Sequence, residues 1–112
     1  MNRYTYSCFM EYTNEEEPEK ALREVANILA KVDDPELIYG FLECLLTPYE
    51  FGEISSRWNL VKLIDQGMSQ RKIATELGLS LCKITRGSKE LKKKNSPFKK
   101  FIDIQKQIDG IR

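Results

Sequence analysis

The segment at residues 69–92, SQRKIATELGLSLCKITRGSKELK, constrains the fold most, because it has the pattern of two short helices joined by a tight turn. Ser69 and Ser80 stand where an N-cap side chain accepts a hydrogen bond from the free amides of a first helical turn. Gly78 lies between the two helices and can adopt the positive φ that ends the first one. The segment therefore predicts a pair of helices, of which the second is basic.

The apolar residues of this segment recur at helical spacing, which predicts the side of each helix that turns inward. These residues are Ile73, Ala74 and Leu77 in the first helix and Leu81, Ile84 and Leu91 in the second. Ala74 is small where the two helices must approach closely. The combination is typical of the helix-turn-helix motif, whose second helix enters the major groove of DNA. The alternative is a plain helical hairpin inside an α domain.

Charge is distributed unevenly along the 112 residues, although the net charge is only +1. Residues 1–55 carry four Lys/Arg and twelve Asp/Glu, a net charge of −8, whereas residues 56–112 carry fourteen and five, a net charge of +9. A positive region of this size attracts polyanions such as DNA. Charge alone would also fit two solvated faces, but its position on the helix-turn-helix half favours a nucleic-acid partner.

Several protein classes are disfavoured by composition. The chain contains no histidine, the commonest general base and metal ligand, and no nucleophile–base pair or phosphate loop stands out. Cys8, Cys44 and Cys82 lack metal-ligand spacing and leave one cysteine unpaired, which fits a reduced cytoplasm. No apolar run is long enough to span a membrane. We therefore expect a cytoplasmic protein that is not an enzyme and holds no metal.

The remaining sequence predicts an all-α chain of six helices. We expect a flexible arm over residues 1–14, where Tyr4, Tyr6, Phe9 and Tyr12 are candidates for docking on a partner, and a single helical domain over residues 15–112. Besides the helix-turn-helix at 69–92, helices are predicted over 15–32, from Pro35, from Pro48 to about residue 66, and from Pro97. Thr47 and Glu50 fit a capping box before the third helix.

The helix that begins at Pro35 is apolar over far more than one face. Its apolar residues are Leu37, Ile38, Phe41, Leu42, Leu45 and Leu46. A helix that is apolar nearly all round must be covered on every side, and a chain this short has few helices with which to cover it. This pattern predicts an obligate, interlocked homodimer.

Five short strings between Leu45 and Phe101 carry a resemblance to a known family: LLTPYE, Arg57-Trp58, GMSQRKIA, ELG and ITRGSKELK. The last string is not a generic feature of helix-turn-helix segments. Over about half of its length, the chain resembles the tryptophan operon repressor family, itself a standard example of helix-turn-helix docking with largely water-mediated base contacts. The resemblance implies an intertwined all-helical homodimer that binds operator DNA and takes L-tryptophan as its corepressor.

The resemblance also implies a tryptophan site. Arginine suits this ligand, because a guanidinium stacks on aromatic faces and bridges carboxylates. The family's two indole-sandwiching arginines fall on Arg57 and Arg86, and Arg86 would also pair with the ligand carboxylate. The other implied ligand residues are Cys44 and Leu46, whose carbonyls would take the ammonium group, Thr47 from the other subunit, Gly87 beside the ring, and Glu90 near the amino end.

Three of these positions also have simpler interpretations. Arg57 could be a solvated helix arginine, Thr47 an N-cap alone, and Arg86 a phosphate contact. Glu90 stands where the family often has a small residue, and its carboxylate could strengthen ammonium binding or repel the ligand carboxylate.

For DNA, the resemblance places Arg71 at the family's arginine that reaches a guanine edge, the commonest specific base contact. The implied groove-facing residues are Leu81, Cys82 and Thr85, with Lys83 adding positive charge there. Lys89 and Lys92 are expected to contact phosphates, which position a protein without reading sequence. Lys93 and Lys94 would either do the same or belong to a solvated linker.

The leading hypothesis is a tryptophan-responsive repressor of tryptophan biosynthesis or transport genes. The bound amino acid would orient the helix-turn-helix so that both heads of the dimer meet successive major grooves, about 34 Å apart. One alternative is a related DNA-binding regulator that senses no ligand or a different one. Another is a helical protein-interaction module with a spurious motif.

Overall fold

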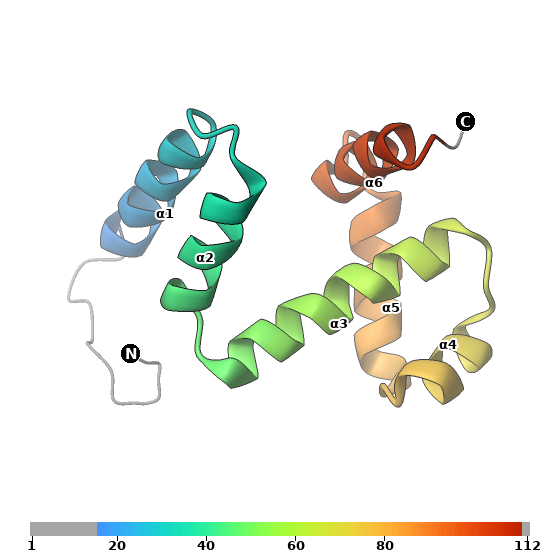
Figure 1. Ribbon diagram of the computed structural model, residues 1–112. Helices are drawn as coiled ribbons and strands as arrows, with labels where there is room; N and C mark the ends of the chain where they lie inside the picture. Colours follow the sequence, from blue (N-terminus) through green and yellow to red (C-terminus); the bar gives the residue numbers. More distant parts are fainter. Residues whose placement is uncertain (1–15, 111–112) are drawn as a thin grey trace. The chain divides into compact units, whose positions relative to one another are not determined.

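The computed structural model describes residues 16–110, and every regular element in that range is a helix (Figure 1). The elements are α1 (Glu16–Leu29), α2 (Pro35–Leu45), α3 (Pro48–Asp65), α4 (Gln70–Leu77), α5 (Leu81–Lys92) and α6 (Pro97–Ile108). The all-α fold class and the six helices are therefore confirmed for the described residues. The expected arm with Tyr4, Tyr6, Phe9 and Tyr12 lies outside them, as does Cys8. No helix within 16–110 is long and apolar enough to cross a membrane.

Helices α3, α4, α5 and α6 begin at capping residues, of which Thr47, Ser69 and Ser80 are the predicted ones. The hydroxyls of Ser69, Ser80 and Ser96 each accept a hydrogen bond from the backbone N–H three residues later, at 3.2, 3.3 and 3.3 Å. Thr47 and Glu50 form the predicted capping box, in which the Glu50 N–H donates to Thr47 Oγ1 at 3.1 Å and the Thr47 N–H donates to Glu50 Oε1 at 2.9 Å. Local sequence thus determines where α3, α4, α5 and α6 start.

The first helix is shorter than predicted and ends at Leu29 rather than at residue 32. The N–H groups of Lys31 and Val32 donate to the carbonyls of Ile28 and Leu29, three residues back, at 3.0 and 3.2 Å. Such bonds tighten the end of a helix and replace a further α-helical turn.

The chain divides into two compact units, Met1–Leu45 and Leu46–Arg112. The first unit contains α1 and α2, and none of its described residues is buried. Its exposed large apolar residues, with their exposed fractions, are Leu22 (67%), Ile28 (56%), Leu37 (60%), Tyr39 (50%), Phe41 (37%) and Leu45 (50%). The described apolar residues of this unit therefore do not form a core of their own.

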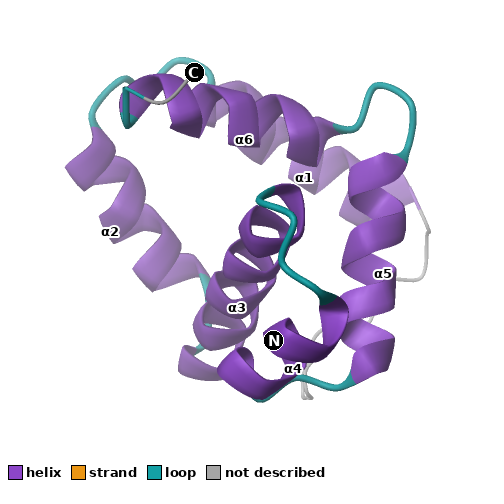
Figure 2. Cartoon of the chain, turned by 90° about the vertical axis from the view of Figure 1, so that its right-hand side faces the viewer, coloured by secondary structure: helices purple, strands orange, loops and turns teal. Residues whose placement is uncertain are grey.

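The second unit has its core where α3, α4 and α5 meet. Leu60, Ile73 and Ile84, one from each helix, are at most 2% exposed. Partly buried residues pack around them: Leu63, Ile64, Met68, Ala74, Leu77 and Leu79. The inward-facing stripe predicted for α4 is thus confirmed. Packing of three helices around these residues fixes the positions of α4 and α5 relative to α3 (Figure 2).

Leu81 departs from the expected inward orientation, because 58% of it is exposed. It is the first residue of α5. Side chains of a helix tilt toward its N-terminus, so a residue in the first position extends past the end of the helix. The buried side of α5 begins one turn later, at Ile84.

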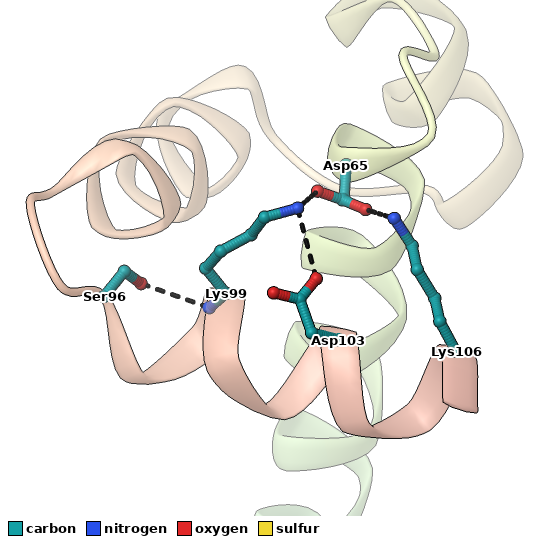
Figure 3. Close-up of polar contacts among 5 residues, drawn as sticks. All are labelled: Asp65, Ser96, Lys99, Asp103 and Lys106. Atoms are coloured by element: carbon teal, nitrogen blue, oxygen red, sulfur yellow. Dashed lines mark hydrogen bonds and ion pairs between the residues drawn. The ribbon is translucent and has the colours of Figure 1, made fainter. Parts of the chain in front are cut away.

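Asp65, the last residue of α3, ties α6 to this unit (Figure 3). Its carboxylate oxygens lie 3.0 Å from Lys99 Nζ and 2.7 Å from Lys106 Nζ, and only 9% of its side chain is exposed. The contact with Lys106 lowers the pKa of Asp65, partial burial opposes this effect, and Lys99 lowers the pKa further. A carboxyl whose pKa is lowered by folding stabilises the fold above its unfolded pKa, and this contribution is lost as pH falls through the folded value.

We expect Asp65→Asn to lower the free energy of unfolding by about 1–2 kcal/mol at neutral pH, because it removes charge-assisted contacts to two lysines. The difference from the parent protein should shrink at pH values below the ordinary carboxyl pKa of 3.8. Urea denaturation at neutral and acidic pH measures both effects.

Asp103→Asn is the matched control. Asp103 also contacts Lys99, at 3.4 Å, but its side chain is 52% exposed, so its loss should change the unfolding free energy by less than about 0.5 kcal/mol. An equal effect of Asp65→Asn at both pH values would contradict an ionic role for Asp65.

Candidate ligand cavity and nucleic-acid interface

A cavity of 380 Å³ lies between α3, α5 and α6 and is called the α3–α5 cavity below. Its walls are formed by Glu53, Ser56, Arg57 and Leu60 of α3, by Lys83, Arg86, Gly87 and Glu90 of α5, by Leu79 and by Phe98 of α6. On each of the two long walls the residues follow the spacing i, i+3, i+4, i+7, which is one face of a helix. Two facing helical stripes therefore build the cavity.

The two arginines that are expected to stack on either face of the indole ring both line this cavity. Arg57 comes from α3 and Arg86 from α5, and both are exposed. Within residues 16–110, neither guanidinium has a hydrogen-bond or ion-pair partner. Two unpaired planar cations beside the apolar side chains of Leu79 and Phe98 can hold a flat ligand with a carboxylate.

Gly87 allows α3 and α5 to approach closely. A Cβ atom at this position would lie 3.0 Å from Leu60 Cδ2 and 3.6 Å from Val61 Cγ1, and both of these residues are buried. Gly87 lines the cavity, but the side chain that it lacks would point toward Leu60 in the core. Its position is thus explained by helix packing as well as by the cavity.

Two ion pairs involve charged residues of the cavity wall. Lys83 Nζ lies 3.5 Å from Glu53 Oε1, and Lys93 Nζ lies 2.7 Å from Glu90 Oε2. The wall carries one excess positive charge, because it contains three cationic side chains and two carboxylates. The cations are Arg57, Arg86 and Lys83, and the carboxylates are Glu53 and Glu90. The cavity thus offers groups of both signs, which matches a zwitterionic ligand.

Leu81, Cys82, Thr85 and Lys89, four of the predicted DNA-contacting residues of α5, lie on another side of that helix, whereas Lys83 lines the cavity. An open surface depression, called the α5 depression below, is lined by Leu81, Cys82, Thr85, Arg86, Lys89 and Glu90. Lys92 is exposed in the last turn of α5, and Arg71 is exposed on α4. Arg86 and Glu90 line both the depression and the cavity, so these two residues join the two candidate sites.

The helices α4 and α5 pack against each other and are joined by residues 78–80 (Figure 2). Gly78 has φ +65° and ψ 31°, the left-handed conformation expected for the residue that ends α4. The structure thus has the pair of short helices and the tight turn that the sequence predicted.

Comparisons with known proteins agree with these features. The family model described as Trp repressor protein matches residues 20–106. The Trp operon repressor homolog of Xylella fastidiosa (strain M23) is 36% identical over 78 residues, which cover 69% of this chain and 85% of that protein. The homolog of Chlamydia caviae is 33% identical over 89 residues, which cover 79% and 88%. This chain belongs to the Trp repressor family. The family consists of DNA-binding regulators and not of enzymes, as the sequence predicted.

Three of the ligand residues that the Trp repressor resemblance implied are not among the residues that line the cavity. Thr47 is the N-cap of α3 and, like Leu46, is not part of the cavity wall. Cys44 is an exposed residue of α2 in the first unit. Because the resemblance assigns Thr47 to the other subunit, a single chain does not test its role.

Sequence reasoning missed Glu53 and assigned Lys83 to DNA alone. The spacing contained a signal for both: Glu53 lies four residues before Arg57, and Lys83 lies three before Arg86. Residues at these separations share a helix face, so an arginine assigned to a cavity points to its neighbours one turn away. No group of three or more side chains suited to a metal ion occurs in the part of the chain that the structure describes.

Proposed function

We propose that this member of the Trp repressor family is a sequence-specific transcriptional repressor that uses L-tryptophan as corepressor and controls genes of tryptophan biosynthesis or transport. The observation that carries the proposal is that Arg57 and Arg86, which have no ion-pair partner among the described residues, line one cavity together with apolar side chains such as Phe98. Membership of a family of DNA-binding repressors supports the part of the proposal that concerns transcriptional repression.

In the proposed complex, the indole ring lies between the guanidinium planes of Arg57 and Arg86. Arg86 also pairs with the ligand carboxylate, since a guanidinium can donate two parallel hydrogen bonds to it. Glu90 lies on the same wall and attracts the ammonium group. The carbonyls of Cys44 and Leu46 accept hydrogen bonds from the ammonium group, and the Thr47 hydroxyl completes the site from the partner subunit.

DNA is bound by the helix-turn-helix that α4 and α5 form. The residues of α5 that face the major groove are Leu81, Cys82 and Thr85, with Lys83 nearby. Arg71 of α4 reaches a base edge. Phosphates are contacted by Lys89 and Lys92. Arg86 and Glu90 belong to both the α3–α5 cavity and the α5 depression, so a ligand acts directly on the helix that meets DNA. Thermodynamic linkage requires that operator DNA strengthen tryptophan binding by the same factor by which tryptophan strengthens operator binding.

The active form is a homodimer in which residues 15–112 of each chain act as one domain. Exposed apolar side chains support this assembly. In the first unit they lie on α1 and α2, and in the second unit α6 carries Phe101, Ile104 and Ile108 at 64%, 51% and 74% exposure. Apolar side chains left exposed in such numbers mark a surface that a partner covers.

A second candidate function keeps the DNA-binding role but changes the ligand. Glu53 and Glu90 both line the cavity, so each offers a carboxylate to the ammonium group of a ligand, although the wall as a whole carries one excess positive charge. An aromatic amine without a carboxylate would fit this arrangement. Tryptamine and L-tryptophan differ in this group and therefore separate the two candidates.

The proposal is tested by selecting bound sequences from random duplex DNA with and without L-tryptophan. We expect a palindrome that is enriched only when tryptophan is present, because the two heads of a dimer read symmetric half-sites. Arg86→Lys should abolish this dependence and weaken tryptophan binding at least about tenfold in calorimetry, since lysine keeps the charge but lacks the planar fork.

Arg71→Ala is the control for that experiment, because Arg71 lies on α4 and not in the cavity wall. It should bind tryptophan like the parent protein while losing base preference. No heat with millimolar L-tryptophan would refute the corepressor, and heat with tryptamine alone would favour the second candidate.

Lys92→Ala should weaken binding to all DNA sequences alike. Loss of one phosphate contact reduces the slope of log K against log salt by about 1 per subunit. Fluorescence anisotropy over a salt series measures the slope, and Lys20→Ala on α1, also an exposed lysine, should leave it unchanged. An unaltered slope in Lys92→Ala would exclude a phosphate contact.

The homodimer is tested by sedimentation equilibrium at micromolar concentration. We expect a single species of twice the chain mass of 13.1 kDa. A folded monomer at that concentration would contradict the assembly, because its apolar α2 would then be stable in water.

A further inference from the structure

One ion pair joins the two walls of the α3–α5 cavity. Lys83 Nζ, from the first turn of α5, lies 3.5 Å from Glu53 Oε1 on α3. Both side chains line the cavity, and they are 53% and 33% exposed. The pair therefore stands where an incoming ligand and solvent both reach it.

Lys83 also lies beside the surface proposed to meet DNA. It directly follows Cys82 and precedes Thr85 by two residues, and both of these line the α5 depression. A lysine side chain has a flexible four-carbon stem, so its ammonium can reach partners on either side of the helix. A carboxylate of α3 and a phosphate of DNA are alternative anions for the same ammonium group.

We propose that Glu53 is a positioning residue that holds Lys83 across the α3–α5 cavity as long as no ligand is bound there, and so withholds one phosphate contact from DNA. This inference rests on the proposed function, because it assumes a ligand in the α3–α5 cavity. A ligand that enters between the two walls separates Lys83 from Glu53. The released ammonium then pairs with a phosphate, and DNA binding strengthens.

The size of the contact suits such an exchange. An exposed ion pair contributes little to stability, because water and salt screen it. A ligand can therefore replace it without disturbing the core, whose residues Leu60 and Ile84 are at most 2% exposed. The expected effect on DNA affinity is accordingly modest, roughly two- to fivefold.

The experiment compares Glu53→Gln with the parent protein by fluorescence anisotropy, with and without L-tryptophan. The DNA is the duplex enriched by selection or, if none is enriched, a random-sequence duplex. Without tryptophan, Glu53→Gln should bind roughly two- to fivefold more tightly, with a salt slope steeper by about 1 per subunit. With saturating tryptophan, it should match the parent protein.

A double-mutant cycle distinguishes release of Lys83 from a general change of charge. In a Lys83→Gln background, Glu53→Gln should no longer tighten binding. Glu76→Gln removes an exposed carboxylate of α4 that is not part of the cavity wall, and its effect should be the same with and without tryptophan and in either background. Glu53→Asp keeps the charge but shortens the reach, so it should resemble Glu53→Gln.

Two results would overturn the inference. One is a gain in Glu53→Gln that persists in the Lys83→Gln background, and the other is a parent-like Glu53→Asp that folds normally by circular dichroism. If the parent protein ignores tryptophan, the corepressor proposal fails, but the cycle in tryptophan-free buffer still decides whether Glu53 withholds Lys83 from DNA.

Discussion

The close approach of α3 and α5 at Gly87 is the contact on which the rest of the second unit depends. A Cβ atom there would come within 3.0 Å of Leu60, which is itself part of the core. With glycine in this place, the α5 stripe that contains Arg86 faces the α3 stripe that contains Arg57. The spacing between these two helix faces is thus set by core packing rather than by loops, so the cavity lies on the closely packed part of the unit.

Helix α5 has three sides with different tasks. On one side, Ile84 and Ser88 are buried against neighbouring helices. On the second side, Lys83 and Gly87 line the α3–α5 cavity. On the third side, Thr85 lines the α5 depression. A twelve-residue helix with this division needs no long chain of contacts between a ligand and DNA. The ligand and the DNA would both contact this one short helix. A change in the orientation of α5 that a ligand favours would therefore change the helix surface that contacts DNA.

Local features of the chain could be predicted from its sequence, because they depend on neighbours within one turn. The serine caps, the capping box at Thr47 and the left-handed Gly78 are of this kind. Contacts between helices distant in sequence could not be predicted from spacing. The pairs of Lys83 with Glu53 and of Lys99 with Asp65 join residues 30 and 34 positions apart. Periodicity identifies the face of a helix but not the helix that lies opposite, and the meeting of Arg57 with Arg86 was expected only through the family resemblance.

The lack of buried residues in the described part of the first unit has a kinetic consequence. If α1 and α2 acquire an interior only from a second copy, their ordering is a bimolecular event whose rate rises with the amount of chain present. Newly made protein would then pass through a period of protease sensitivity that shortens as its level increases. Abundance would govern not only how often an operator is occupied but also how long each polypeptide survives.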